Sequence, residues 1–378
     1  MQDHKAALLV PTHRTGREAL ANISYVAACS GPDLPVYISD NSTSPEKHRF
    51  LNELAKNHQN VHVLLNRENI GAFPNFLNLL SASEGAEIIA FITDDDRFSL
   101  PYITRGIRDL RQNTDIARSA GRLIRFQANG GIFEDTKDSI SDSVSDRFSE
   151  FFDPNSFNQI FYSPFRRKDI QCWLSFRAEH PIQGPFFDFL LTLCTLASGK
   201  FSRHNEGYYI YFSENWDNPM ENQSSRTRAY ESLGLPGTFA LFHDLHFGIE
   251  CVNLLLGKHS PISNQATAVA CARTAWQRCV GRFASIYVSQ RDTYTTLFGS
   301  NPRILEISDA LSGDKEIPLD HVLTHFVNLV ANFSEPISKR YFEYIKANYW
   351  TASNLKCNTP PRVRCTDANQ YDIPTASA

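Results

Sequence analysis

The 378-residue sequence lacks any excess of charge of one sign and any long apolar run. Its 37 basic and 41 acidic residues leave a formal net charge of -4, which excludes a global field for holding nucleic acid or an anionic membrane. No apolar run approaches the roughly 20 residues that span a bilayer, and the first residues lack the pattern of a signal peptide. We therefore expect no integral membrane segment and a cytoplasmic location, with peripheral contact at the inner membrane face as an alternative.

The sequence also lacks paired cysteines. None of its eight cysteines belongs to a CxxC motif, whereas metal clusters and the disulfide frameworks of small domains space their cysteines more tightly. We interpret them as reduced, mostly buried thiols. Only Cys357 and Cys365 lie in a polar segment where a crosslink could form.

What the sequence does contain is a regular alternation of strand-like and helical segments. Short apolar runs, each followed by a polar loop, predict strands at 5–13, 34–44, 60–69 and 86–96, and amphipathic segments between them predict helices. Strict alternation of this kind is typical of an α/β fold with a mostly parallel, Rossmann-like sheet and helices on both faces.

The rest of the chain extends this domain and then becomes mostly helical in pattern. We predict a mobile loop or an exposed helix at 133–154 and a domain boundary in the polar stretch 218–228. The predicted domains are an α/β domain at 1–217, a mainly α-helical domain at 229–353 and a loose tail at 354–378. Core packing is the favoured use of the helical domain's aromatic residues, and the alternatives are an acceptor site, a homodimer interface or a membrane-surface contact.

Polar residues follow each of the first four predicted strands. They are Thr12 to Arg14, Asp40 and Asn41, Asn66 to Gly71, and Asp94 to Asp96. Because ligands bind outside the carboxyl ends of the strands in such sheets, four polar loops at one edge predict a binding site.

The acidic triplet at this edge suggests what the site binds. Alternate residues leaving a strand point to the same side, so Asp94 and Asp96 can face one ligand while Asp95 faces another way. Neighbouring carboxylates raise one another's proton affinity unless a cation compensates. Mn²⁺ or Mg²⁺, which prefer oxygen ligands, would supply that compensation and hold a diphosphate.

The four segments resemble family 2-like glycosyltransferases of the GT-A fold. "LLVPTHR" is similar to the family's opening strand and turn, and "VYISDNSTS" is similar to its second-strand motif. "NRENIGAFPNFLNLL" resembles its Asn-x-Gly stretch, and "IAFITDDDRF" resembles its metal-binding Asp-x-Asp motif. The resemblance covers about the first hundred residues and implies a nucleoside-diphosphate sugar donor and a hydroxyl-bearing acceptor such as a glycan.

The resemblance also implies roles for single residues. The implied donor-binding residues are Pro11, Thr12, Arg14, Asp40, Asn69, Gly71, Asn75, Asp94 and Asp95. Asp94 and Asp96 are the implied metal ligands, although the triplet permits two registers and Asp95 could replace either. The alternative for Asp40 is a turn or helix cap, and for Gly71 an ordinary helix boundary.

A catalytic base is expected on a later helix. Gly184 and Pro185 mark a break, so a helix at 186–198 would carry Asp188 in its first turn, where the helix dipole favours a carboxylate. The family places its base at the start of the corresponding helix, usually within an acidic pair, whereas here Phe187 precedes Asp188. As the base, Asp188 would accept the acceptor's proton in an inverting transfer, and the alternative is a simple helix-start charge.

The resemblance further implies a metal ligand or phosphate contact from a later region. The candidates are His204, Glu214, Asp217, His243 and His246. We select His243 as the metal ligand, because it lies three residues from His246 on a helical pattern. Exposed helix histidines are the commoner alternative.

Other classes fit less well. A haloacid-type phosphatase also has an Asp-x-Asp motif, but there it opens the domain, whereas here three strand–helix units precede it. A sugar nucleotidyltransferase needs a glycine-rich phosphate loop, and "VPTHRTGRE" has only one glycine. A non-catalytic domain of the same fold that binds a sugar or a partner remains the main alternative.

Overall fold

The computed structural model describes residues 5–127, 129–135, 138–153, 158–213, 218–313, 317–350 and 362–363. The chain forms two compact units. The sheet unit comprises Met1–Asp142, Ser156–Gln171 and Phe187–Pro219, and the helical unit comprises Ser143–Asn155, Cys172–Phe186 and Met220–Ala378. The chain therefore passes between the units several times rather than at one boundary, and nearly all of the predicted tail lies outside the described residues.

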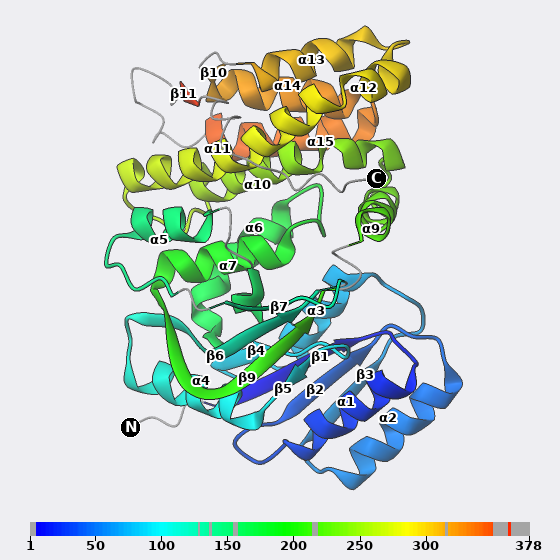
Figure 1. Cartoon of the computed structure of the whole chain (residues 1–378), viewed down its shortest axis with the longest axis vertical. Coiled ribbons are helices and arrows are strands. Elements are labelled where there is room, and N and C mark those ends of the chain that lie inside the picture. Colours follow the sequence, from blue (N-terminus) through cyan, green and yellow to red (C-terminus); the bar gives the residue numbers. More distant parts are fainter. Residues whose placement is uncertain are drawn as a thin grey trace. The chain divides into compact units, whose positions relative to one another are not determined.

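The sheet unit is built on a nine-stranded sheet with the order β3-β2-β1-β4-β8-β6-β9-β5, and β7 pairs with β6 (Figure 1). The strands are β1 (Ala6–Thr12), β2 (Val36–Asp40), β3 (Val61–Leu65), β4 (Ile88–Phe91), β5 (Arg97–Phe98), β6 (Ile116–Phe126), β7 (Ile132–Asp135), β8 (Phe165–Arg166) and β9 (Lys200–Phe212). The long pairings, β1 with β2 and β4, β2 with β3, and β6 with β9, are parallel. The antiparallel pairings are short, so the predicted fold class is confirmed.

The helices of this unit follow the strands as predicted. They are α1 (Arg17–Ala28), α2 (Pro45–Asn57), α3 (Ala72–Ala82), α4 (Leu100–Gln112) and α7 (Phe187–Ser198), with short 3-10 turns η1 (Asn158–Tyr162) and η2 (Arg167–Ile170). Since β1, β2 and β3 progress in one direction and β4 lies on the other side of β1, right-handed crossovers place α1 and α2 on one face and α3 on the other. Figure 1 shows α1 and α2 in front of the strands.

The sheet register brings the predicted loops to one edge. Every residue of β1 is buried, as expected for a central strand covered on both faces. At its carboxyl end Thr12 pairs with Asp40 of β2, and Leu9 pairs with Phe91 of β4. The polar residues that follow these strands consequently share the carboxyl edge of the sheet.

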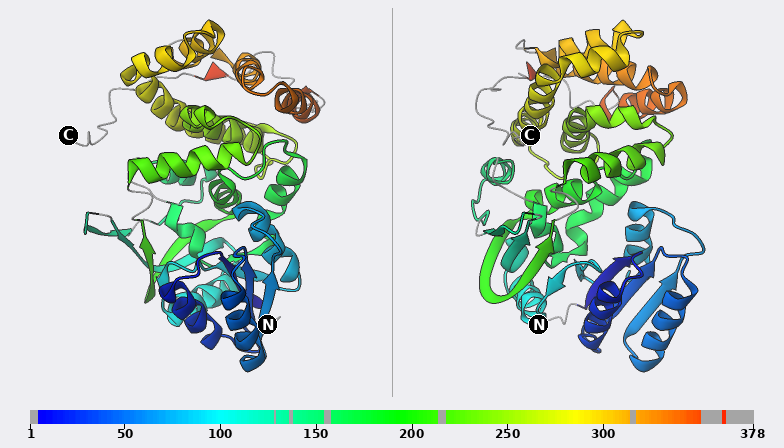
Figure 2. Two further views of the ribbon diagram at one scale, coloured as in Figure 1. Left: turned by 90° about the vertical axis from the view of Figure 1, so that its right-hand side faces the viewer. Right: turned by 45° about the vertical axis from the view of Figure 1, so that its right-hand side comes forward.

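The helical unit packs its apolar residues between helices. Its helices are α5 (Val144–Phe151), α6 (Gln171–Glu179), α9 (Pro219–Glu231), η3 (Gly237–Phe242), α10 (His243–Leu256), α11 (Gln265–Ser289), α12 (Arg291–Phe298), α13 (Pro302–Ser312), α14 (Leu319–Ala331), α15 (Glu335–Ile345) and η4 (Lys346–Trp350), and a short pair of strands joins β10 (Ile317–Pro318) to β11 (Arg362–Val363). Helices α10 and α11 pack side by side, as do α14 and α15 (Figure 2). At the α10–α11 contact, Gly248 leaves only 3.0 Å between an added Cβ and Val280, so a side chain there would push the helices apart.

Two segments without a clear apolar pattern form helices. Most of the polar stretch at 218–228, which we predict as a domain boundary, lies in α9, where Tyr230 is the one buried residue among those described. The chain passes from the sheet unit to the helical unit at Pro219–Met220, within that stretch. The segment at 133–154 contains β7 and α5, and α5 buries Phe148 against neighbours that include α11. A helix with a single buried position, or one whose apolar residues are few, is hard to recognise from periodicity.

One helical stretch of the described residues is long and apolar enough to cross a membrane by length and composition. It is Gly237–Leu256, which spans 20 residues, and 72% of its most apolar window is buried inside the protein. The sequence led us to expect no such stretch. A helix in the core of a protein passes the same test, and the burial of this one fits that interpretation.

Candidate donor and catalytic site

The carboxylate of Asp94 ties the loop after β4 to the loop after β1. Its Oδ2 accepts hydrogen bonds from the Thr12 hydroxyl and from the backbone N–H groups of His13 (3.3 Å) and Arg14 (3.2 Å). Its Oδ1 accepts one from Arg14 Nη1 at 2.8 Å. A carboxylate offers about four lone-pair sites, so these four donors occupy Asp94, which is 2% exposed.

Asp96 ties the same loop to strand β9. Thr93 Oγ1 (2.6 Å) and Tyr209 Oη (2.7 Å) donate to its Oδ2, and the backbone N–H of Phe212 (3.1 Å) donates to its Oδ1. Burial, and next the charge of Asp95, raises the pKa of Asp96 to about 7. A carboxylate in this setting is held by the protein and has little contact with solvent.

Asp95 is the exposed member of the triplet. Its side chain is 32% exposed, and its Oδ2 forms an ion pair with Arg14 Nη2 at 2.8 Å. Asp94 and Asp96, the implied metal ligands, are buried at 2% and 1% exposure, so Asp95 is the member of the triplet with access to solvent. The role of each carboxylate towards a metal stays a prediction.

A divalent cation fits Asp95 better than it fits Asp94 or Asp96. Mg²⁺ is commonly held by one or two carboxylates together with substrate phosphates and water, and Asp95 is the carboxylate with solvent access. Within the described ranges, no group of three His, Cys, Asp or Glu side chains could hold a metal by itself. The other ligands would therefore come from donor oxygens and water.

Asp188 belongs to the same electrostatic neighbourhood as the triplet. Burial raises the pKa of Tyr211, and the charges of Asp96, Asp95 and Asp188 add to the rise. Burial, then Tyr211 and then the same three carboxylates raise the pKa of Tyr162, whose ring stacks on that of Tyr211 with 5.9 Å between centroids. Asp188 and the acidic loop thus both contribute to the raised pKa values of Tyr162 and Tyr211.

The position of Asp188 is fixed by the turns that lead into α7. Gly184 has φ 123° and Phe186 has φ 61°, a value that strains a bulky side chain. Helix α7 begins at Phe187, so Asp188 lies in its first turn as predicted. Asn158 Nδ2 donates to Asp188 Oδ2 at 3.1 Å.

A buried arginine holds the elements that carry Asn158 and Asp188. Arg118 of β6 donates through Nη1 to the carbonyl oxygens of Ile160 and Phe161, both at 3.0 Å, and through Nε to Thr195 Oγ1 of α7 at 2.8 Å. No pattern in the sequence marks Arg118, because its partners lie far away along the chain.

Asp40 is fully buried, and a lysine, a histidine and a neighbouring serine hold its carboxylate. Lys47 Nζ lies 2.8 Å from its Oδ1 and also donates to Thr12 Oγ1 at 2.7 Å. Ser42 Oγ donates to Asp40 Oδ2 at 2.6 Å, and His48 Nε2 lies 3.3 Å from the same oxygen. Lys47 therefore links Asp40 to Thr12, and Thr12 in turn donates to Asp94. No spacing in the sequence identifies Lys47 as part of the site.

The remaining predicted donor contacts lie in the loops after β2 and β3. Pro11 of β1 pairs in register with Ser39 of β2. Gly71 has φ 87°, a conformation that favours glycine, and its N–H donates to Asn69 Oδ1 at 3.0 Å. Asn75 is buried and donates to the Ser39 carbonyl at 3.0 Å, so it holds the loop together, whereas Asn69 is exposed.

His243 lies in the helical unit, whereas Asp94 and Asp96 lie in the sheet unit. Its ring packs on that of Phe186, with 4.5 Å between centroids, and its Nδ1 is 3.3 Å from Tyr230 Oη. Burial lowers the pKa of His243 well below its usual value. Its role as a metal ligand stays a prediction.

The other later candidates are distributed as follows. His246 is fully buried and lies 3.4 Å from Glu250 Oε1. His204 lies in β9, and burial lowers its pKa. Glu214 and Asp217 lie outside the described residues.

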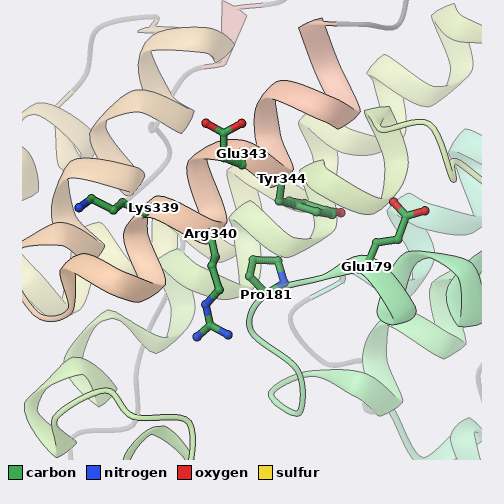
Figure 3. Close-up of a pocket in the computed structure, with 6 residues that line it drawn as sticks. All are labelled: Glu179, Pro181, Lys339, Arg340, Glu343 and Tyr344. Carbon is green, nitrogen blue, oxygen red and sulfur yellow. The ribbon is translucent and has the colours of Figure 1, made fainter.

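A pocket of about 530 Å³ lies in the helical unit (Figure 3). It is lined by Glu179, Pro181, Lys339, Arg340, Glu343 and Tyr344. None of the predicted site residues is among them. Its two acidic and two basic side chains balance, so its charge does not select a ligand by sign.

Comparison with known proteins agrees with the resemblance over part of the chain. Residues 8–174 match the family model described as glycosyl transferase family 2. Asp188 and strand β9 lie beyond the matched segment. No curated protein matches the chain.

Solved structures give a more distant likeness. The crystal structure of S. aureus TarS 1-349 is similar with a TM-score of 0.42 and 13% identity, over 87% of this chain and 91% of that one. A second crystal structure of S. aureus TarS has a TM-score of 0.39 and 14% identity, over 75% of this chain and 49% of that one. Scores this low support no argument by themselves. The similarity to glycosyl transferase family 2 therefore rests on the match of residues 8–174 to the family model.

Proposed function

We propose that this protein is a cation-dependent glycosyltransferase that moves a sugar from a nucleoside diphosphate to an acceptor hydroxyl with inversion of configuration. The observation that carries the proposal is the match of residues 8–174 to glycosyl transferase family 2, in a segment whose acidic loop leaves one carboxylate, Asp95, with access to solvent. Asp188 lies in the same sheet unit, in the first turn of α7.

The donor would lie along the carboxyl edge of the sheet. Thr12, Asp40 and Asp94 are joined there by hydrogen bonds and ion pairs that also include Lys47. Such pre-organised loops bind a ligand without first having to order themselves. Arg14, which is partly exposed, offers a guanidinium suited to phosphate oxygens.

Asp188 would act as the general base. Its carboxylate accepts the proton of the acceptor hydroxyl while that oxygen forms a bond to the anomeric carbon. The bond from this carbon to the diphosphate breaks on the opposite face, and the electron pair leaves with the diphosphate. Asn158, by donating to Asp188 Oδ2, favours the ionised form and fixes its direction.

Asp95 would hold Mn²⁺ or Mg²⁺. When bound, such an ion offsets the charge that develops on the departing diphosphate. With the leaving group stabilised in this way, no protein acid is required to protonate it.

Release of nucleoside diphosphate from a panel of uridine and guanosine diphosphate sugars tests the proposal. We expect turnover of at least one donor with Mn²⁺ or Mg²⁺, loss of turnover with chelator, and a fall of about 10²- to 10⁴-fold for Asp188→Asn. Glu206→Gln, an exposed acid of β9, is the matched control. Full turnover by the Asp188→Asn protein would show that Asp188 is not the base. Turnover in the presence of chelator would show that the transfer needs no divalent cation.

Three further expectations stay predictions. They are a cytoplasmic location, a peripheral membrane contact and a homodimer formed through the C-terminal helices. The identities of the sugar and the acceptor depend on loops whose sequences carry no general code.

A further inference from the structure

Arg14 occupies the side of the acidic loop where a cation would bind. Its Nη1 lies 2.8 Å from Asp94 Oδ1 and its Nη2 lies 2.8 Å from Asp95 Oδ2. One guanidinium therefore bridges two carboxylates, with a hydrogen bond to Asp94 and an ion pair to Asp95.

The carboxylates of Asp94 and Asp95 differ in how many other groups hold them when the guanidinium leaves. Asp94 also accepts from the Thr12 hydroxyl and from the N–H groups of His13 and Arg14, so it stays held without the guanidinium. Within the described residues, Arg14 is the one ion-pair partner of Asp95. The Asp95 contact is consequently the one that can open at little cost to the loop.

The charges make this contact a competition. The Arg14 guanidinium is always a cation, because arginine does not lose its proton in proteins. A divalent ion that took Asp95 Oδ2 as a ligand would have to displace this guanidinium and would be repelled by it.

We propose that Arg14 is a competing internal cation, which neutralises Asp95 in the cation-free protein and must release it before a divalent ion binds there. This inference rests on the proposed function, because it takes Asp95 as the cation ligand. A guanidinium released in this way can pair with the donor diphosphate, so cation and nucleotide binding would assist one another. Coupling between two ligands typically changes affinity by about 5- to 150-fold.

The test is binding of Mn²⁺ alone, measured as loss of the free-ion signal in electron paramagnetic resonance. We expect Arg14→Gln to bind Mn²⁺ about tenfold more tightly than the wild type, within the usual range for coupled cations and ligands. Uridine or guanosine diphosphate should then improve Mn²⁺ binding less in Arg14→Gln than in the wild type. The double variant Arg14→Gln/Asp95→Asn should lose the gain.

Arg97→Gln is the matched control. Arg97 is also half-buried and adjoins the triplet, but its Nη1 donates to the backbone oxygen of Asp96 at 3.1 Å rather than to a carboxylate. Removing it changes the local charge equally without freeing Asp95. If Arg14→Gln loses the wild-type circular dichroism spectrum, Arg14→Lys carries the test, because one ammonium cannot reproduce the fork, and a smaller gain is expected.

Three results would overturn the inference. They are an unchanged Mn²⁺ affinity in the folded Arg14 variant, an equal gain in Arg97→Gln, and a gain that survives Asp95→Asn. None of them would touch donor turnover by the wild type, which tests the proposed function separately.

Discussion

Each unit of the protein has a cluster of buried carboxylate and cationic groups, and the two clusters differ in what they leave accessible. In the helical unit, Glu250 is 1% exposed and lies 3.0 Å from His180 Nε2, 3.4 Å from His246 Nε2 and 2.8 Å from Tyr341 Oη. In the sheet unit, Asp95 stays 32% exposed. A charged cluster therefore indicates a ligand site where one of its carboxylates keeps access to solvent.

The chemical logic of the two clusters differs accordingly. Burial raises the pKa of Glu250, but His180 and His246 outweigh this and hold the pKa well below its usual value. The charge is thus compensated inside the protein. At the sheet edge one guanidinium, that of Arg14, bridges Asp94 and Asp95, and Asp95 keeps the access to solvent that a bound cation needs.

The largest effect should come from breaking the buried cluster around Glu250 in the helical unit. Glu250→Ala leaves the Tyr341 hydroxyl and the imidazoles of His180 and His246 without the carboxylate they contact, and each buried polar group left without a partner costs about 1–3 kcal/mol. Urea unfolding followed by tryptophan fluorescence measures this loss, because Trp173 and Trp276 are both buried in the helical unit. Glu250→Gln, which keeps the shape, should lose less, and a wild-type midpoint in Glu250→Ala would contradict a sealed structural role.

The next largest effect concerns the buried ion pair of Asp40 and Lys47 at the sheet edge. Lys47→Met leaves the Asp40 carboxylate without its lysine partner and should destabilise the sheet edge by about 3 kcal/mol. Hydrogen exchange at the amides of β1 and β2 measures this change. Asp40→Asn/Lys47→Met removes both charges and should recover most of the loss, so a double variant no better than the single one would show that Lys47 acts otherwise than by neutralising Asp40.

The sequence predicts the fold in the places where it is periodic. Strands β1, β2 and β4 are almost wholly buried, so their apolar runs are continuous, and the helices between the first four strands each bury one set of residues. Strands β5 and β8 have only two residues each, which is too short for any period. Helix α9 buries too little to show one.

The site was predictable in part for the same reason. Thr12, Asp40 and the acidic triplet follow strands, and parallel strands bring their carboxyl ends together whatever the details of packing. The orientation of the triplet was not predictable, because it depends on Tyr209 and Phe212, more than a hundred residues away. Long-range hydrogen bonds of this kind leave no pattern in a single sequence.

A smaller effect is expected where Asn158 meets the proposed base. Asn158→Leu removes a hydrogen bond to the Asp188 carboxylate, and hydrogen bonds to charged groups are worth about 1.5–3 kcal/mol. The acid limb of the pH profile of kcat/KM should therefore move up by about one pH unit. Any donor that the wild type turns over serves for the measurement.

Two variants frame that result. Asn158→Asp places a negative charge beside Asp188 and should move the limb further in the same direction. Ser149→Ala, a change on the exposed face of α5, should leave the limb in place. An unmoved limb in both Asn158 variants would show that Asn158 does not act on the proton of the base.

The smallest effect should appear in the pH dependence of the helical unit. His243 is kept neutral by burial, and then by Arg226 of α9, by His246 on its own helix and by Arg282 of α11, all of which lower its pKa. Its pKa in the unfolded chain is about 6.5, so below that pH the unfolded chain takes up a proton that the folded chain refuses. The free energy of unfolding that depends on neutral His243 is therefore complete above about pH 6.5. It is lost as the pH falls, by up to about 1.4 kcal/mol per pH unit.

Urea midpoints of the wild type and of His243→Gln, compared from pH 7.5 to pH 5 by tryptophan fluorescence, isolate the effect of His243, because every other titrating group is common to both proteins. A difference between the two that stays constant with pH would mean that His243 carries its proton in the folded chain, and the contrast between a sealed helical unit and an open sheet edge would then be smaller than the burial of these groups indicates.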